Sequence, residues 1–221
     1  SDAYLTECQA SVTALTDQGV VLDRTVFYPM GGGQAGDAGV LVLADGRELP
    51  IADTRKGKDA EGKFTNEICH IPASDRQPSL SIQDRCAQLG LKTGDTVTAR
   101  VDWARRHRLM RFHTTTHLLC ALVPHPVDGC SITAGYARLD FHMNEPLDKD
   151  ALTAGIARLV AEAHPVRHRW ISEDELDANP GLVRSMSVQP PRGLGRIRVL
   201  EIEGVDLQPC GGTHVGNTAE I

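Results

Sequence analysis

The sequence predicts an α+β fold in which a small N-terminal β-barrel over residues 1–102 precedes a two-layer core of helices and antiparallel sheet over residues 103–221. Two observations support this division. Short β-rich runs separated by glycine turns fill the first hundred residues, whereas helical periodicity begins only after Asp102. A chain of 221 residues is also long enough for one large domain or two small ones.

The first part of the chain is expected to contain short antiparallel strands. Asp45-Gly46 is a strong turn signal that joins two of them into a hairpin. Many short strands without helical period are typical of a small barrel or sandwich. The expected strands cover residues 20–22, 25–28, 40–43, 48–51, 67–71 and 96–101.

The second part of the chain should alternate helices with strands. Asp102 is the expected N-cap of a long helix that runs to Val123 and is ended by Pro124. Ser172 opens a capping-box pattern, and the short helix that follows should stop before Pro180. The other expected elements are a strand over 132–143, a helix over 147–163, a strand over 166–171, a loop over 189–193 and a strand over 197–202.

Composition excludes several classes of function. No apolar run approaches the roughly 18 residues that a membrane span needs, and the first residues lack a signal sequence, so the cytoplasm is the expected compartment. The net charge of −6 argues against broad nonspecific binding to nucleic acid. The six cysteines show no paired spacing, so no disulfide framework is expected. Only Cys210 has polar neighbours that indicate a thiolate, and the other five are interpreted as small buried residues.

Arginine is concentrated in two stretches despite the negative net charge. Five arginines and a single acid occupy residues 100–111, and a second arginine-rich group lies within residues 184–198. Two interpretations stay open for these stretches. They form either a solvated helix face and a loop, or two patches that hold phosphates near a metal.

Two short motifs carry the most specific chemistry. His113 and His117 are spaced i, i+4 on the expected helix, which places both imidazoles on one face. Cys210 and His214 are joined by two glycines and a threonine, so the backbone can turn both side chains toward one centre. Three imidazole nitrogens and one sulfur suit zinc. The sequence therefore predicts a Zn²⁺ site with these four residues as ligands.

Other interpretations of the motifs fit less well. Zinc peptidases need a glutamate directly after the first histidine as general base, and here that residue is Thr114. A purely structural zinc is the stronger competitor, because four protein ligands close a tetrahedron. The glycine run 31–36 matches a dinucleotide-binding pattern, but strand and hairpin follow it where a helix is required. These glycines would let the backbone approach a ligand, and the amide of Gln34 follows them. The segment would therefore suit one wall of a substrate pocket.

Three strings, in order across essentially the whole chain, resemble a known family. They are Thr25 to Pro29 with Gly31 to Gln34, Arg111 to Leu119, and Asp206 to Val215. They are similar to the editing domain of alanyl-tRNA synthetases, and most similar to its free-standing relatives, the AlaX proteins of medium length. The resemblance implies a β-barrel followed by an α+β editing core. It also implies hydrolysis of wrongly charged alanine tRNA, chiefly seryl esters, with glycyl esters as a further candidate.

Selectivity adds a physical constraint to this resemblance. Accepting serine while rejecting alanine requires a buried group that pairs with the serine hydroxyl, because a merely roomy pocket also admits alanine. Thr25 is the candidate for that group, against the alternative of a strand threonine without substrate role. Gln34 is the second candidate catalytic residue, acting on water or the oxyanion. Substrate or tRNA contacts are expected at Gly32, Gly33, Arg105, Arg106 and Asp206.

Two further hypotheses stay open at this stage. The chain could be a zinc-stabilised RNA-binding module without catalysis, including an editing domain excised from a larger synthetase, or an editing enzyme for another amino acid. The expected partner is the aminoacylated 3′ end of alanine tRNA, and no membrane is expected. The oligomeric state is left open, with a monomer as one option. Whether zinc activates water or only organises the site is also left open.

Overall fold

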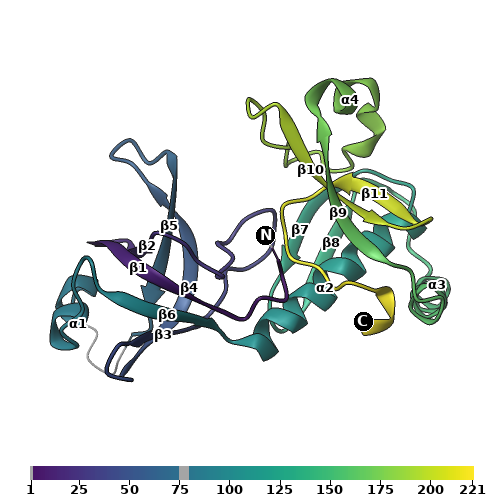
Figure 1. The fold of residues 1–221 in the computed structure, drawn as a ribbon. Helices are drawn as coiled ribbons and strands as arrows, with labels where there is room; N and C mark the ends of the chain where they lie inside the picture. Colours follow the sequence, from purple (N-terminus) through teal and green to yellow (C-terminus); the bar gives the residue numbers. More distant parts are fainter. Residues whose placement is uncertain (1, 75–79) are drawn as a thin grey trace. The chain divides into compact units, whose positions relative to one another are not determined.

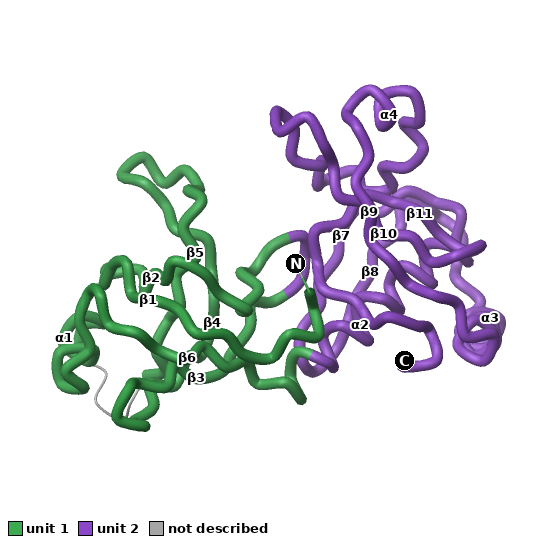
Figure 2. The backbone as a smooth tube through the Cα atoms, viewed as in Figure 1, with its two compact units in different colours: residues 1–31, 35–106 green, residues 32–34, 107–221 purple. Residues whose placement is uncertain are grey.

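The computed structural model describes residues 2–74 and 80–221. The chain divides into two compact units and passes between them at three points along the sequence (Figure 2). The last of these points follows Arg106, four residues after the boundary that the sequence pattern predicts at residue 102. The first unit comprises residues 1–31 and 35–106, and the second unit comprises residues 32–34 and 107–221.

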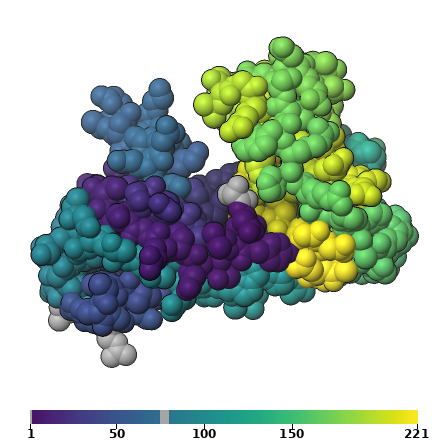
Figure 3. Space-filling model, in the orientation of Figure 1, coloured from purple at the N-terminus to yellow at the C-terminus, as the bar shows by residue number. Residues whose placement is uncertain are grey.

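The first unit is a closed antiparallel barrel, as the sequence predicts. In the order in which they pair, its strands are β1 (Glu7–Thr16), β2 (Gly19–Leu22), β5 (Phe64–Pro72), β4 (Glu48–Lys58), β3 (Gly39–Leu43) and β6 (Thr96–Val101). The Asp45-Gly46 turn joins β3 to β4 as expected, with Gly46 at a φ of +87°, which glycine adopts without strain. The far ends of β4 and β5 project from the barrel, in blue in Figure 3.

Alternating side chains fill the barrel. In β6, Val97, Ala99 and Val101 are buried, while the residues between them are half-buried or exposed. Leu41 on β3 and Ile51 on β4 join the same apolar cluster. The period of two that predicts these strands therefore also selects the residues of the core.

One segment predicted as a strand is irregular. Residues 25–28 lie outside every strand, because side chains accept the N–H groups that a strand would pair with a neighbour. The Thr25 hydroxyl accepts the Phe27 N–H (3.0 Å), and the Asp37 carboxylate accepts the Tyr28 N–H (2.7 Å). The strand prediction for this segment is wrong for that reason.

A short helix is also absent from the sequence prediction. α1 (Ile82–Gln88) lies between β5 and β6. The Ser81 side chain caps it by accepting the Asp84 N–H (3.0 Å), which satisfies one donor of the first turn. The expectation that the first hundred residues contain only strands is therefore corrected here.

The second unit contains most of the predicted helices. α2 (Trp103–Leu122) begins in the first unit and continues into the second, and Asp102 caps it by accepting the Arg105 N–H (3.0 Å). The later elements are β7 (Val127–Ile132), β8 (Ala137–Phe141), α3 (Lys149–Ala161), β9 (Val166–Ser172), α4 (Glu173–Ala178), β10 (Arg196–Ile202) and β11 (Asp206–Pro209), with 3₁₀ turns at Pro180–Leu182 and Thr218–Glu220. β9, β10 and β11 form one antiparallel sheet, and Figure 1 shows them side by side.

One predicted strand of this unit is a hairpin. Residues 132–143, expected as a single strand, contain the end of β7, a turn and all of β8. The Thr133 hydroxyl closes the turn by accepting the N–H groups of Gly135 (3.2 Å) and Tyr136 (3.1 Å). No Asn-Gly or Asp-Gly pair marks this turn, so the strand pattern of the sequence continues through it and predicts one strand instead of two.

The other predictions for the second unit are confirmed. The helix expected over 147–163 is α3, and the strands expected over 166–171 and 197–202 are β9 and β10. Ser172 caps α4 by accepting the Glu175 N–H (3.0 Å). Two apolar clusters hold the sheet, and their buried members are Leu118, Leu159, Val166, Leu200 and Ile202 in one and Ile171, Leu176, Ile197 and Val199 in the other. Within residues 2–74 and 80–221, no helix combines the length and apolar character that crossing a membrane requires.

Candidate metal centre

α2 presents two histidines on one side. His113 and His117 are about one helical turn apart, and their ring centroids lie 5.4 Å from each other. Both side chains are buried. Arg184 holds the end of this helix by donating to three carbonyl oxygens at and just beyond its C-terminus, at 2.8 to 2.9 Å. The i, i+4 spacing in the sequence therefore produces the shared face that it predicts.

The second motif follows β11. Cys210 and His214 lie in the turn after this strand, separated by a pair of glycines and a threonine. A Cβ atom on Gly212 would overlap the His113 ring and would lie 2.8 Å from the Gln34 Oε1. Only glycine therefore allows the backbone of this turn to come so close to the first motif.

The two motifs meet in one cluster within the second unit. One donor atom from each of His113, His117, Cys210 and His214 lies within 4.8 Å of the others. The Cys210 Sγ is 3.5 Å from the His113 Nε2 and 3.2 Å from the His214 Nε2. The three histidines are buried and Cys210 is half-buried. This is the set of four ligands that the sequence predicts, and it can hold a metal ion.

Each imidazole of the cluster has its Nδ1 atom hydrogen-bonded outward, which leaves the Nε2 atom to face Cys210. Such outer hydrogen bonds are characteristic of metal-binding histidines, because they fix the ring orientation and the tautomer. The pairs are His113 Nδ1 with Gln34 Oε1 (2.8 Å), His117 Nδ1 with Asp206 Oδ2 (3.2 Å), and His214 Nδ1 with Thr114 Oγ1 (3.1 Å). Sequence reasoning missed this role of Thr114, for which the only signal was its place inside the first motif.

The electrostatics of the cluster favour a thiolate. Burial raises the pKa of the Cys210 thiol, but the neighbouring imidazoles of His113 and His214 outweigh burial and hold that pKa well below its usual range. Burial lowers the pKa of His117, but hydrogen bonds to Asp206 and Cys210 outweigh it and raise the pKa to about 9. In contrast, burial raises the pKa of the thiols of Cys8, Cys69, Cys86, Cys120 and Cys130.

The glycine segment before Gln34 packs against β7. The Gly33 carbonyl accepts the Ile132 N–H (2.8 Å), and a Cβ atom on Gly33 would lie 2.8 Å from the Cys130 carbonyl oxygen. Gly32 and Gly33 have φ values of +59° and +85°, a region that favours glycine. The close approach that Gly33 permits is therefore to the protein itself, and ligand contact at Gly32 and Gly33 stays a prediction.

Gln34 and Asp206 both contact histidines of the cluster. Gln34 is fully buried, and its amide is hydrogen-bonded to His113 and Thr213. The Asp206 side chain is 8% exposed and lies against His117. Both residues thus belong to the hydrogen-bonded layer around the four donors. A direct part for Gln34 in catalysis, or for Asp206 in substrate binding, stays a prediction.

Arginines from both predicted patches have partners within the protein. Arg106 is 2% exposed, and its guanidinium binds the Asp37 carboxylate and two backbone carbonyl oxygens (2.6 and 2.9 Å). In the second patch, Arg198 donates to two carbonyl oxygens of the second motif (2.7 and 3.0 Å). The burial of Arg106 argues against a phosphate contact there. Arg105, which is half-buried, is the better placed of the two predicted tRNA-binding arginines.

Thr25 lies beside a buried histidine in the first unit. Its Oγ1 is 2.7 Å from the His70 Nε2 and accepts the Phe27 N–H. The His70 Nδ1 is 2.8 Å from the Val20 carbonyl oxygen, which only accepts, so Nδ1 carries the ring hydrogen. Burial lowers the pKa of His70 to about 4, so near neutral pH the Nε2 atom is an acceptor. The Thr25 hydroxyl therefore donates to His70, and its oxygen can still accept one more hydrogen bond.

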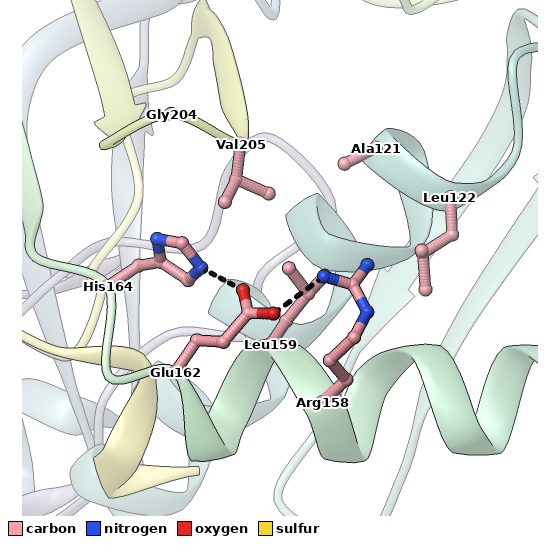
Figure 4. Close-up of a pocket in the computed structure, with 8 residues that line it drawn as sticks. All are labelled: Ala121, Leu122, Arg158, Leu159, Glu162, His164, Gly204 and Val205. Atoms are coloured by element: carbon pink, nitrogen blue, oxygen red, sulfur yellow. Dashed lines mark hydrogen bonds and ion pairs between the residues drawn. The ribbon is translucent and has the colours of Figure 1, made fainter.

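The second unit has a separate hollow of about 220 Å³. Figure 4 shows the side chains that line it. The Glu162 carboxylate on its wall accepts hydrogen bonds from His164 (2.6 Å) and Arg158 (2.7 Å). These two bonds hold the pKa of Glu162 below its usual range. The charged groups of the hollow compensate one another, so we place the candidate site at the histidine and cysteine cluster instead.

Comparison with known proteins connects both ends of the chain to tRNA synthetases. The profile of the class II (A) tRNA synthetases matches residues 3–105, and that of the second additional domain of threonyl and alanyl tRNA synthetases matches residues 197–221. The chain is 36% identical to the alanyl-tRNA editing protein AlaX-M of Methanosarcina acetivorans over 230 residues, which cover the whole chain and 87% of that protein. It is 35% identical over 229 residues to AlaX-M of Methanosarcina barkeri, again covering the whole chain and 87% of the relative. It is also 33% identical to the alanine–tRNA ligase of Metallosphaera sedula over 229 residues, which cover the whole chain but only 23% of the ligase.

Proposed function

The chain belongs to the AlaX-M family of alanyl-tRNA editing proteins, and from this premise we propose that it is a deacylase of wrongly charged alanine tRNA. The observation that supports this most is the four-donor cluster, which the two motifs form together. The chain that carries these motifs matches a named editing protein over the whole of its own length. In the reaction, water adds to the ester between an amino acid and the terminal ribose, and the ester C–O bond breaks. The products are the free amino acid and a tRNA with a free ribose hydroxyl.

Zinc is the metal we propose for the cluster. Three imidazole nitrogens and a thiolate are ligands that zinc prefers, whereas magnesium and calcium prefer oxygen. When bound, zinc supplies Lewis acidity toward an ester carbonyl. The low pKa of Cys210 supports this assignment, because the thiolate and not the thiol binds metal. The outward hydrogen bonds of the three histidines support it further, because they keep the rings in one orientation.

Seryl esters are the substrates we propose, with Thr25 as the residue that selects them. Serine differs from alanine by one hydroxyl, so discrimination needs a group that pairs with it. Because the Thr25 hydroxyl donates to His70, its oxygen is available as an acceptor for the hydroxyl hydrogen of serine. The half-buried position of Thr25 supports a role in which water competes weakly for that acceptor.

Deacylation of alanine tRNA charged with serine, glycine or alanine tests the function. The zinc-loaded wild type should hydrolyse the seryl ester much faster than the alanyl ester. Cys210→Ala should lose hydrolysis and keep tRNA binding. Cys130→Ala is the matched control, because it removes a thiol that lies outside the four-donor set. A zinc-loaded wild type that binds tRNA but hydrolyses neither these three esters nor any ester in a wider panel of charged tRNAs would establish a non-catalytic module instead.

Selectivity is tested separately by changing Thr25. Thr25→Val should reduce the preference for seryl over alanyl esters about five- to tenfold, because a neutral hydrogen bond contributes on the order of 1 kcal/mol. Thr25→Ser keeps the hydroxyl and should retain the preference. Equal ratios of kcat/KM in wild type and Thr25→Val would remove Thr25 from the selection of serine. A fast reaction with another ester in a wider panel of charged tRNAs would show a different amino-acid specificity.

A further inference from the structure

Gln34 has a position that its predicted action on water does not explain. It is 0% exposed and belongs to the three-residue segment 32–34 that is part of the second unit. Its backbone forms a parallel bridge with Ile132 at the end of β7. A side chain enclosed in this way acts through the groups that it touches.

The orientation of the Gln34 amide is determined by a backbone donor. The Thr213 N–H points at the Gln34 Oε1 (3.0 Å), and an N–H group can only donate. The Gln34 Nε2 donates in turn to the Thr213 Oγ1 (2.7 Å). The oxygen and nitrogen of this amide are therefore assigned by their partners.

The amide orientation in turn determines the tautomer of His113. The Gln34 Oε1 is also 2.8 Å from the His113 Nδ1, and a carbonyl oxygen only accepts, so this nitrogen carries the ring hydrogen. The lone pair of His113 is then on Nε2, the atom that lies 3.5 Å from the Cys210 Sγ. The same oxygen thus orients a ligand of the first motif and holds Thr213, the residue directly before His214 in the second motif.

We propose that Gln34 is a positioning residue of the metal centre. It holds His113 in the tautomer and ring orientation that present Nε2 to the metal, and it ties the second motif to the first through Thr213. It does this without touching the reacting ester. The proposal rests on the cluster being a zinc site and not on the hydrolysis itself, so zinc affinity measured without tRNA tests it apart from the proposed function.

Three variants separate positioning from packing and from catalysis. Gln34→Met keeps the length of the side chain but removes the acceptor, so zinc affinity should fall about 10- to 100-fold, the usual range for loss of an outer partner. Gln34→Glu keeps an acceptor oxygen for both His113 and Thr213 and should stay within a few-fold of wild type. Thr116→Val is the matched control. It removes a buried hydroxyl that bonds the His113 carbonyl (2.7 Å) and not the ring, and zinc affinity should not change.

Zinc affinity is measured by competition with a chromophoric chelator, and the ring nitrogens of His113 are assigned by ¹⁵N NMR of the zinc-loaded protein. The wild type should show a hydrogen on the His113 Nδ1 and the metal on Nε2. Wild-type zinc affinity in Gln34→Met would overturn the proposal. Equal losses of affinity in Gln34→Glu and Gln34→Met would also overturn it, because the acceptor would then be irrelevant. An inactive Gln34→Met with unchanged zinc affinity would instead place Gln34 in catalysis.

Discussion

Replacing Asp37 by alanine should lower the free energy of unfolding of the first unit by about 3–5 kcal/mol. Asp37 is 1% exposed, and its carboxylate accepts hydrogen bonds from the Arg106 Nε (2.9 and 3.0 Å) and from the Tyr28 N–H (2.7 Å). Without Asp37, the Arg106 guanidinium keeps its charge, because arginine does not deprotonate in proteins. The cost is large because, among the residues that the structure describes, that buried cation would then have two backbone carbonyl oxygens and no carboxylate as partners.

Urea unfolding followed by tryptophan fluorescence measures this loss. The chain has two tryptophans, so a Trp170→Phe background leaves Trp103, which belongs to the first unit, as the reporter. Glu7→Ala is the control. Glu7 pairs with Arg100 between β1 and β6 (2.9 Å), but both side chains are about half exposed, so the expected loss is about 0–1 kcal/mol.

A double replacement then isolates the charge. Asp37→Leu with Arg106→Met removes both charges and should recover much of the stability that Asp37→Ala loses. The reasoning is refuted if Asp37→Ala unfolds within about 1 kcal/mol of the wild type, the range of an exposed pair. In that case the burial of Arg106 would not depend on Asp37, and a phosphate contact by Arg106 would regain support.

Three other outcomes follow from residues already described. Burial lowers the folded pKa of His70 to about 4 from an ordinary 6.5, so between these values the unfolded state binds more protons and stability should fall as the pH falls. The difference in urea stability between wild type and His70→Gln should change by on the order of 3 kcal/mol across this window, and a constant difference would contradict it. Gly212→Ala should abolish tight zinc binding, because its Cβ would overlap the His113 ring. Gly211→Ala should bind zinc normally, because its Cβ meets no atom within 4 Å. Equal zinc content in the two variants would show that the turn can shift. Chelation of zinc should lower the unfolding midpoint reported by Trp170 and leave that reported by Trp103 unchanged, and parallel shifts of both probes would mean that the units unfold together.

The four-donor cluster could be predicted from sequence because each of its two motifs obeys a local rule. His113 and His117 share a face of any helix that contains them, and Cys210 and His214 share a single turn. The partners behind these ligands follow no local rule. Gln34 lies 79 residues before His113 and 179 residues before Thr213 along the chain, so only the folded structure brings the three together.

The two mistaken strand predictions, at residues 25–28 and 132–143, share one physical cause. Side chains that bond to nearby backbone compete with regular structure, and their choice depends on tertiary contacts. The hydroxyl of Thr25 takes a backbone N–H in a segment whose β-branched and aromatic residues predict a strand. Thr133 does the same in the middle of another predicted strand and produces a turn there. The burial of Arg106 was missed because its partner is distant in the chain. Arg106 lies among other arginines in the sequence, and nothing near it indicates the Asp37 carboxylate, 69 residues away.

The assignment of residues 32–34 to the second unit has a consequence for protein engineering. Both stretches that flank this segment belong to the first unit, so no single cut in the chain separates the two units. A fragment that starts at His107 would carry all four residues of the candidate metal centre and lack the Gln34 amide, which contacts the His113 ring. Transplanting the metal centre into another scaffold therefore requires the glycine segment as a second piece, or a new acceptor built to face the His113 ring.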